Sequence, residues 1–361
     1  MFRALILTLL CLVLVACSEG TLPPTSPTIA SQPLSGAYWP TQGWRSSSPE
    51  EQGMHGQMLE DLLTSIRKSG PDLDSLLIIR HGYIVSETYF HDYAPDKVHQ
   101  QYSCTKSFIA TLIGIAIDRG LIADTSQPVT DLIPGYELDD LDPHKRQMTL
   151  EHLLTMTTGL GWQEEDPTFA ALYRSDDWVS YVMGLPMLAR PGSEFNYCSG
   201  CSHVLSAIIQ SASGMNTQDF AKDSLFAPLG ISNFDWETDP DGTPIGGWGL
   251  FLTPRDMAKL GYLYLHAGEW DGEQVVSSSW IQRAAQKLVD ADGYFGYGYQ
   301  WWIYPRFGAY AALGRDGQTI FVVPEQDLIV VTTAGAQPNH DAIFERIENG
   351  ILPEIIDHER R

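Results

Sequence analysis

The chain has 361 residues, 43% of them hydrophobic, and carries 22 Lys and Arg residues against 45 Asp and Glu residues. Binding to nucleic acid and attraction to anionic lipids both depend on clustered Lys and Arg. A net charge of -23 without a basic cluster therefore excludes both kinds of partner. The apolar share, with 11% aromatic residues, predicts a folded acidic domain rather than a disordered chain.

Residues 1–16 have the pattern of a secretory signal, in which a basic residue precedes an apolar run and small residues precede a cleavage site. The apolar run, 4–16, is too short to cross a bilayer, which needs roughly 20 residues. Its end, Leu14-Val15-Ala16-Cys17, resembles the lipobox of bacterial lipoproteins. An ordinary signal peptide with an incidental cysteine is the alternative.

The lipobox resemblance implies cleavage before Cys17 and lipidation of that cysteine. It implies a lipoprotein of the bacterial cell envelope that faces the periplasm, and Ser18 in place of Asp is similar to lipoproteins sorted to the outer membrane. The protein would then meet a membrane only through this lipid anchor. Residues 17–43 are rich in Ser, Thr and Pro and predict an extended tether.

The remaining chain predicts strands at both ends and helices between them. Two β-rich runs flank His81-Gly82 and predict a hairpin, and a helix over 105–121 ends near Gly120. The predicted strands are 75–80, 83–89, 299–304, 309–313, 319–323 and 328–333, and the further helices are 150–156, 178–183, 203–212, 255–266 and 341–351.

This order predicts an α/β fold of the α+β type. Short turns between the C-terminal strands favour an antiparallel sheet, which helices would flank. We predict one folded domain over residues 44–352, followed by a C-terminal tail, 353–361. Its α/β part would comprise about 44–125 and 286–352, and an all-α part, about 126–285, would be inserted between them.

Ser103-Cys104-Thr105-Lys106 is an S-x-x-K motif. Residues three apart share one face of a helix, so the Lys106 amine would stand beside the Ser103 hydroxyl. The start of a helix also offers free backbone N–H groups to an anion. Ser65 and Lys68 have the same spacing, but only Ser103 precedes a mostly apolar helix of the kind buried in a core.

Two further elements lie downstream. Tyr197-Cys198-Ser199 follows a Pro-Gly turn and precedes a helix, a context that the similar Tyr173-Arg174-Ser175 lacks. The other element is the segment Gly314-Arg315-Asp316-Gly317-Gln318, in which two glycines flank the cationic Arg315 and a predicted strand follows. Alone, this last segment would be interpreted as a β-turn.

In this order the three elements resemble the serine β-lactamase and DD-peptidase superfamily, in its class C and esterase-like branch. Segments 151–160, 252–261 and 268–272 also resemble the family, so the resemblance covers about residues 44–352. It is nearest to the aminohexanoate-oligomer hydrolases and the family VIII carboxylesterases. The implied fold is β-lactamase/transpeptidase-like.

The resemblance implies a serine hydrolase that forms an acyl-enzyme on Ser103, needs no cofactor and holds no metal. Lys106 and Tyr197 would share the proton transfers, and the sequence leaves open which is the base, since an ammonium near a phenol stabilises the phenolate. Backbone N–H groups of Ser103 and Gln318 would form the oxyanion hole. Ser199 would hold the Lys106 amine or a polar group of the substrate.

The third element departs from the family, where Lys-Thr-Gly is usual. Asp316 would repel a substrate carboxylate by about 1 kcal/mol or more, or would pair with Arg315. We therefore predict small neutral or cationic esters and amides as substrates, contacted by Ser199, Arg315, Asp316, Gly317 and Trp248. Trp248 could instead be ordinary packing. The alternatives are a β-lactamase or peptidoglycan DD-carboxypeptidase, and a binding or sensor module that acylates slowly or not at all.

The three cysteines that remain besides Cys11 in the signal and Cys17 at the lipidation site, which are Cys104, Cys198 and Cys201, cannot all pair. In an oxidising compartment a disulfide is possible. The C-x-x-C of Cys198 and Cys201 could bind metal or act in redox chemistry, but no second pair completes a zinc set. A Cys104–Cys198 bridge would connect the first two motifs. We favour Cys104 as a small buried residue of a core helix, and His152 as a structural histidine.

Overall fold

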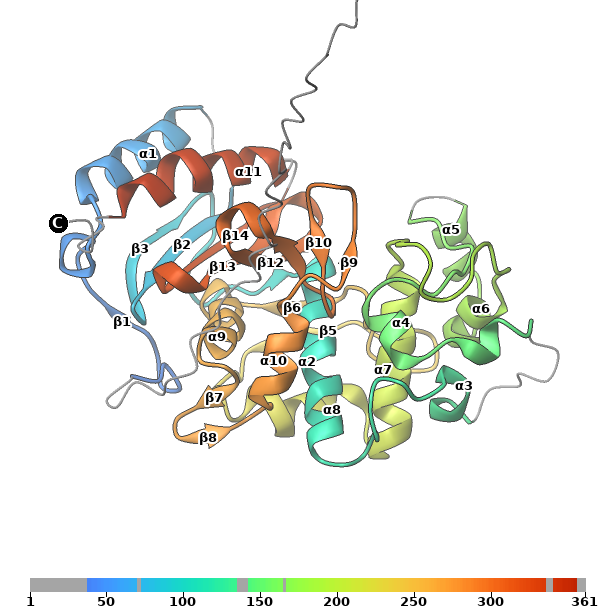
Figure 1. Ribbon diagram of the computed structural model, residues 1–361. Coiled ribbons are helices and arrows are strands. Elements are labelled where there is room, and N and C mark those ends of the chain that lie inside the picture. The colour runs from blue at the N-terminus through green and yellow to red at the C-terminus, as the bar shows by residue number, and fades with distance from the viewer. Residues whose placement is uncertain (1–37, 70–72, 135–141, 165–166, 336–339, 356–361) are drawn as a thin grey trace, which may run out of the picture.

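The computed structural model describes residues 38–69, 73–134, 142–164, 167–335 and 340–355. The predicted signal peptide, Cys17 and most of the tether lie outside these residues, as does most of the predicted tail. Figure 1 shows a large twisted sheet with helices on both faces, beside a region of short helices.

The described part of the chain contains a nine-stranded sheet with the order β1-β3-β2-β14-β13-β12-β11-β10-β9. Only β1 runs parallel to its neighbour, and all other pairs are antiparallel. The strands are β1 (Arg45–Ser46), β2 (Ser75–Arg80), β3 (Tyr83–Tyr89), β9 (Val289–Asp290), β10 (Gly296–Tyr297), β11 (Trp302–Tyr304), β12 (Ala309–Gly314), β13 (Gln318–Val323) and β14 (Leu328–Thr333). The predicted α/β fold with an antiparallel sheet is therefore confirmed.

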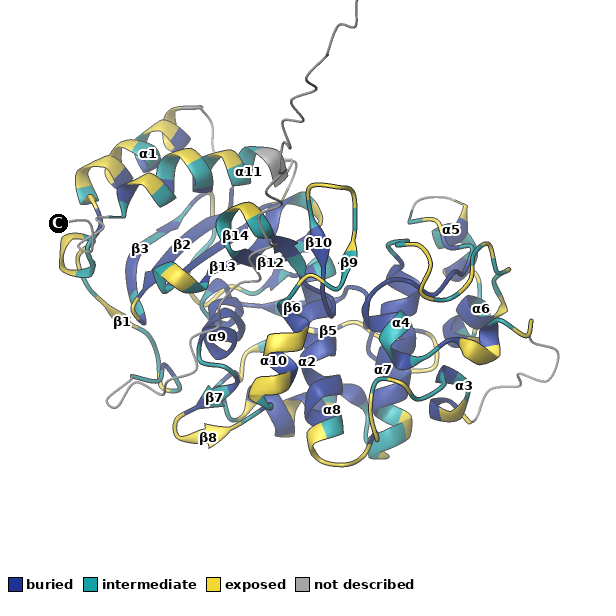
Figure 2. Cartoon of the chain, in the orientation of Figure 1, coloured by how far each residue is buried: buried dark blue, intermediate teal, exposed yellow. Residues whose placement is uncertain are grey.

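The pairing of β2 with β14 joins the two ends of the domain, with Ile79 opposite Ile329. Both strands are buried along their whole length (Figure 2). Since side chains alternate between the two faces of a strand, Ile78 joins the cluster under α1 (Gly56–Ser69) and α11 (His340–Arg346). Ile79 joins the cluster on the opposite face. A sheet covered on both faces explains why these strands are almost continuously apolar.

The opposite face of the sheet is covered by α9 (Pro254–Leu265) and by the central helix α2 (Thr105–Asp118). Gly261 lets α9 approach closely, since a Cβ there would lie 3.1 Å from side chains of Ile320 and Ile329. The sequence analysis placed α9 in the helical part, but its packing on β2, β13 and β14 assigns it to the sheet part. Next to it lies α10 (Ser278–Ala284), which packs on α2.

The helical region is built around α7, which packs against α2, α4, α6 and α8. Residues 105–116 of α2 are all buried, and one continuous core extends from the sheet through α2 into this region. Contact between α2 and α7 therefore fixes the N-terminal ends of these two helices relative to each other. The first motif lies at the start of α2 and the second at the start of α7. The helices are α3 (Val129–Leu132), α4 (Leu150–Leu154), α5 (Thr168–Leu172), α6 (Trp178–Gly184), α7 (Ser199–Ser213) and α8 (Thr217–Ala221).

Two small sheets complete the fold, and two predicted boundaries move. The strands are β4 (His99–Gln100), β6 (Leu250–Leu252) and β5 (Phe234–Trp236) in one sheet, and β7 (Glu269–Trp270) and β8 (Glu273–Gln274) in the other. Helix α7 begins at Ser199 rather than at 203, because the Cys198 sulfur accepts a hydrogen bond from the Cys201 N–H (3.0 Å) and caps the first turn. Strand β11 begins at Trp302, because Gln300 has a left-handed φ of 60°.

The folded domain starts before residue 44, earlier than predicted. The Trp39 ring lies 5.6 Å from that of Trp270, whose Nε1 donates to Thr41 Oγ1 (2.7 Å). Gly230 packs directly on the Thr41 backbone. Residues 38–43 are therefore part of the domain. Composition alone suggested a tether because Pro and Ser dominate the segment before them.

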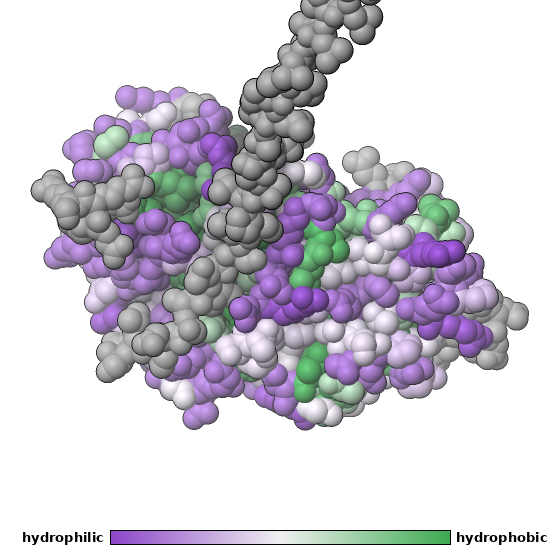
Figure 3. Space-filling model, in the orientation of Figure 1, coloured by the Kyte–Doolittle hydropathy of each residue, from purple (hydrophilic) through white to green (hydrophobic). Residues whose placement is uncertain are grey.

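The surface seen in Figure 3 is mainly hydrophilic over the described residues, with small hydrophobic areas between the helices. This agrees with the excess of 45 acidic residues over 22 basic ones. None of the helices described is long and apolar enough to cross a bilayer.

Candidate active site

The first motif lies at the start of the central helix. Ser103 belongs to the 3-10 turn Tyr102–Cys104, directly before α2. Tyr102 has a φ of 45°, a left-handed value that non-glycine residues rarely adopt. Such backbone strain concentrates at functional sites. It places the Ser103 side chain in a cavity while the following helix stays buried in the core.

The Lys106 ammonium is held by three acceptors. Its Nζ donates to Ser103 Oγ (2.8 Å), Ser199 Oγ (2.9 Å) and the Gly247 carbonyl oxygen (2.7 Å). All three N–H bonds are therefore engaged, which fixes the amine against the serine hydroxyl. Burial lowers the pKa of Lys106 to about 8, and the Glu164 carboxylate opposes this effect. A buried amine that loses its proton near neutral pH can act as a general base.

Tyr197 lies on the other side of this amine. Lys106 Nζ is 4.8 Å from the centroid of the Tyr197 ring, and the Trp302 ring stacks on Tyr197 at 5.7 Å. Burial raises the pKa of the Tyr197 phenol, Glu164 raises it further, and a hydrogen bond with Ser103 acts in the opposite direction. The neutral phenol is therefore favoured, in contrast to the phenolate considered from the sequence.

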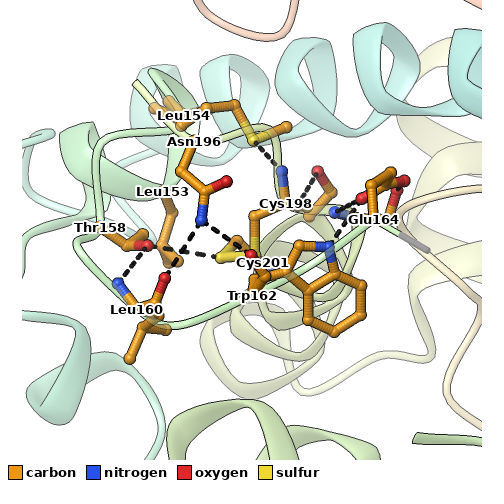
Figure 4. Close-up of a disulfide and its surroundings, with 12 residues drawn as sticks. Leu153, Leu154, Thr158, Leu160, Trp162, Glu164, Asn196, Cys198 and Cys201 are labelled. Atoms are coloured by element: carbon orange, nitrogen blue, oxygen red, sulfur yellow. Dashed lines mark hydrogen bonds between the residues drawn. A yellow bond between two sulfur atoms is a disulfide. The ribbon is translucent and has the colours of Figure 1, made fainter. Parts of the chain in front are cut away.

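Glu164 is a site residue that the sequence analysis missed. Its Oε2 accepts hydrogen bonds from the Ser199 N–H (3.1 Å) and from Trp162 Nε1 (2.7 Å), and its Oε1 accepts one from Ser199 Oγ. Figure 4 shows Trp162 and Glu164 beside the start of α7. A hydrogen-bonded chain thus runs from Ser103 through Lys106 and Ser199 to this carboxylate. Glu164 lies in a loop and has no motif spacing to the other residues.

Cys198 and Cys201 form a disulfide across the first turn of α7, with Cα atoms 5.2 Å apart (Figure 4). Asn196 also fixes this segment, since its Nδ2 donates to the Leu160 and Trp162 carbonyl oxygens. Cys104 is a free, buried thiol, and burial raises its pKa. The Cys104–Cys198 bridge considered from the sequence does not form, because Cys198 is bonded to Cys201 and Cys104 is a free thiol.

The third motif is the turn between β12 and β13, where Gly314 pairs with Gln318. A Cβ at Gly314 would lie 2.2 Å from the Gln101 carbonyl oxygen, so only glycine fits beside the Ser103 turn. The Cys104 thiol donates to the Gln318 carbonyl oxygen (3.4 Å), which places β13 next to Ser103. This is the neighbourhood that the predicted oxyanion hole requires.

Beside Ser103 is a cavity of 580 Å³. Its lining residues are Gln100, Tyr102, Ser103, Glu164, Phe169, Tyr173, Ser199, Glu237, Trp248 and Arg315. Four of these, Ser103, Ser199, Trp248 and Arg315, were predicted as site residues. Lys106 lies beneath the cavity floor, where it is buried.

Asp316 and Gly317 do not line this cavity, in contrast to the prediction. Asp316 occupies the left-handed position of the turn (φ 60°), and the Gly317 carbonyl oxygen accepts a hydrogen bond from Thr332 Oγ1 (2.7 Å). Within the described ranges Asp316 and Arg315 form no ion pair. The Arg315 side chain therefore adds its positive charge to the cavity, which Glu164 and Glu237 also line.

His152 has a structural role, as expected. Its Nδ1 lies 3.0 Å from the Thr149 N–H and completes a capping box at the start of α4. Such reciprocal bonds satisfy the free N–H groups at a helix start.

Comparisons with known proteins agree with this geometry. Residues 74–349 match the profile of the beta-lactamase family. The 6-aminohexanoate-dimer hydrolase of Paenarthrobacter ureafaciens is 25% identical over 304 residues, which cover 78% of this chain and 77% of that protein. Penicillin-binding protein 4 of Amycolatopsis lactamdurans is 25% identical over 277 residues, which cover 65% of this chain and 71% of its own length.

A solved structure shows the same fold. The Bacillus anthracis protein assigned as a 6-aminohexanoate-dimer hydrolase superposes with a TM-score of 0.72 at 24% identity, over 89% of each chain. The family predicted from the three motifs is therefore confirmed, and the profile match covers most of the chain. The chain belongs to the beta-lactamase family and is a serine hydrolase.

Proposed function

We propose that the protein hydrolyses small esters and amides through an acyl-enzyme on Ser103. The observation that carries the proposal is the 2.8 Å contact between Lys106 Nζ and Ser103 Oγ beside a 580 Å³ cavity. A serine hydroxyl is a poor nucleophile until a neighbouring base removes its proton. A buried amine within hydrogen-bond distance meets that requirement.

In the proposed reaction the neutral Lys106 amine accepts the Ser103 proton as Oγ bonds to the carbonyl carbon. Backbone N–H groups of Ser103 and Gln318 stabilise the oxyanion. The C–O or C–N bond of the substrate then breaks, and the leaving group takes a proton from Lys106, directly or through the Tyr197 phenol. Water attacks the acyl-enzyme, releases a carboxylic acid and restores Ser103.

Lys106 is favoured over Tyr197 as the base for two reasons. Its amine is in direct contact with the nucleophile, and burial brings its pKa to about 8. The Tyr197 phenol has a raised pKa, so its deprotonated form is scarce at neutral pH. Tyr197 then serves as a neutral hydrogen-bond partner of Ser103.

Labelling with a fluorophosphonate probe, followed by intact-mass spectrometry, tests the proposal. The wild-type chain should gain the mass of one probe, and Ser103→Ala should gain none. Ser65→Ala is the matched control, because Ser65 belongs to a second S-x-x-K sequence on the exposed side of α1. Absence of a Ser103-dependent mass gain would overturn the proposal in favour of a binding or sensor module.

Esters and amides are favoured over β-lactams because Arg315-Asp316-Gly317 lacks the hydroxyl of the Lys-Thr-Gly that is usual in β-lactamases. The relative named a 6-aminohexanoate-dimer hydrolase supports an amide substrate. Initial rates on a p-nitrophenyl ester and on a chromogenic cephalosporin distinguish an esterase from a β-lactamase. Cephalosporin turnover far above ester turnover would favour the β-lactamase or DD-carboxypeptidase alternative, to which the penicillin-binding relative points.

We also propose that the protein is exported and lipidated at Cys17. The lipobox sequence supports this, and so does the Cys198–Cys201 disulfide, since disulfides persist in oxidising compartments. In a bacterial host the wild-type chain should be found in the outer-membrane fraction, and Cys17→Ser should not. Cys11→Ser, a change within the predicted signal, is the control that should keep the wild-type distribution.

A further inference from the structure

One wall of the active-site cavity is aromatic. It consists of Phe169, Tyr173 and Trp248, and we call it the aromatic wall. Ring centroids of Phe169 and Trp248 are 5.1 Å apart, those of Tyr173 and Trp248 are 6.0 Å apart, and Phe169 stacks on Tyr173 at 6.2 Å. Trp178 supports the wall from behind, at 5.6 Å from Trp248. The three rings are therefore held as one surface.

Glu237 borders the same cavity, directly after β5. Its backbone is fixed on both sides, since its N–H donates to the Gly249 carbonyl oxygen (2.9 Å) and its carbonyl oxygen accepts from the Ile245 N–H (2.9 Å). Its carboxylate accepts only a long hydrogen bond, from Gln100 Nε2 (3.4 Å). Over the residues covered by the structure, no Lys, Arg or His forms an ion pair with it.

This carboxylate lies close to the aromatic wall. Burial raises the pKa of the Tyr173 phenol, the negative charge of Glu237 raises it further, and Arg315 acts in the opposite direction. Burial also raises the pKa of Glu237, and the neighbouring Asp235 raises it further. The other carboxylate of the cavity, Glu164, is already bonded to Ser199 and Trp162. Glu237 is therefore the acidic group that remains available to a ligand.

We propose that Glu237 and the aromatic wall form a subsite for an ammonium group of the substrate. The inference rests on the proposed hydrolysis at Ser103 and names its substrate class: small esters and amides that carry a primary or quaternary amine. A cation is attracted to the faces of aromatic rings, and more strongly where water is partly excluded. An opposite charge beside the rings adds to this attraction.

The remaining charges of the cavity agree with this assignment. Its described lining carries two carboxylates, Glu164 and Glu237, against one cation, Arg315, which leaves one net negative charge. Arg315 comes from the β12–β13 turn, and its charge also acts on Tyr173, although less strongly than that of Glu237. A purely apolar substrate chain on this wall would bury the Glu237 carboxylate without a partner, which is unfavourable.

The test compares two p-nitrophenyl esters of the same shape, in a short series of chain lengths. One ends in a trimethylammonium group and the other in the neutral tert-butyl group. We expect the wild type to show a higher kcat/KM for the cationic ester. Glu237→Gln should lower this preference by about fivefold, as loss of one ion pair at an exposed carboxylate implies.

Two further variants separate this subsite from general effects. Asp241→Asn removes one negative charge from the segment after β5, at an exposed residue outside the cavity lining, and should keep the wild-type preference. Tyr173→Leu keeps an apolar side chain but removes one ring, and should lower the preference in the same direction as Glu237→Gln.

The outcomes are distinct. Ser103-dependent turnover of both esters, with a preference that Glu237→Gln and Tyr173→Leu do not change, would overturn the subsite while the proposed hydrolysis stands. An equal loss in Asp241→Asn would attribute the preference to overall charge and would also overturn the subsite. Absence of Ser103-dependent turnover of either ester would overturn the proposed function itself.

Discussion

Lys106 donates all three of its ammonium hydrogens to protein oxygens, so it must lose one of them before it can accept the Ser103 proton. The hydrogen bonds around Ser199 provide a path for that proton. Ser199 Oγ accepts from Lys106 and donates to Glu164, whose carboxylate faces the cavity. Glu164 thus has two effects on Lys106: it offers a route for the proton, and its charge stabilises the ammonium form.

The pH dependence of acylation follows from the interaction between Lys106 and Glu164. If neutral Lys106 is the base, kcat/KM for a neutral ester should rise with pH and level off above about 8. Glu164→Gln removes the charge that favours the ammonium, so the pKa of Lys106 falls and the rising limb should move to lower pH. Rates measured from pH 5 to 10 check the direction of this shift.

The control is Asp176→Asn, which removes one carboxylate of the helical region at an exposed position outside the cavity lining. Its profile should match that of the wild type. A lower rate in Glu164→Gln with an unmoved profile would show that Glu164 only positions Ser199, and would contradict the electrostatic account.

At the scale of single elements, the start of α7 combines structure and chemistry. Tyr197 and Ser199 flank Cys198, whose disulfide to Cys201 closes a loop with a sequence separation of 3. So short a loop restricts the unfolded chain only modestly, by about 2 kcal/mol in the chain-entropy account. Its larger effect should be on the orientation of the Tyr197 and Ser199 side chains.

The double variant Cys198→Ser/Cys201→Ser separates these effects. We expect the free energy of unfolding in urea to fall by about 2 kcal/mol, and the rate of probe labelling at Ser103 to fall as well. Ser213→Ala is the matched control, because Ser213 Oγ bonds the opposite end of the same helix. It should lower stability without slowing the labelling. Unchanged labelling in the double variant would limit the disulfide to a stabilising role.

The sequence could predict those parts of the site that are local in the chain. Ser103 and Lys106 are one helical turn apart, and Tyr197 and Ser199 are two residues apart, so their spacing identifies them. Glu164 and Glu237 enter the cavity from loops far from both motifs, and only tertiary packing brings them there. The start of α7 was also missed, because a cysteine sulfur is not among the preferred helix caps.

The strands were predicted more accurately than the boundaries of the two parts. Buried strands such as β13 and β14 have continuous apolar runs that turns interrupt clearly. The assignment of α9 to the sheet part depends on contacts with β14, which helix periodicity cannot reveal. The whole molecule is organised around α2, whose core is continuous with both parts, so the cleft residues from each part are fixed relative to Ser103.

The N-terminal boundary is a property of the whole molecule, because residues 38–43 pack on elements far later in the chain. The Trp39 ring contacts Trp270, and Thr41 accepts the hydrogen bond of Trp270 Nε1. Removal of this segment would expose aromatic surface and replace the hydrogen bond of Trp270 Nε1 by one to water. Aromatic pairs contribute about 0.5–1.5 kcal/mol each, and a hydrogen bond contributes about 0.5–1.5 kcal/mol net.

We therefore expect a chain that begins at residue 44 to unfold with a free energy about 1–3 kcal/mol lower than a chain that begins at residue 38. Urea unfolding followed by tryptophan fluorescence measures the difference, and both chains should keep Ser103-dependent labelling, because Trp270 lies outside the cavity lining. The single change Thr41→Val in the longer chain isolates the hydrogen bond and should account for part of the loss. Equal stability of the two chains would show that the folded domain begins at residue 44.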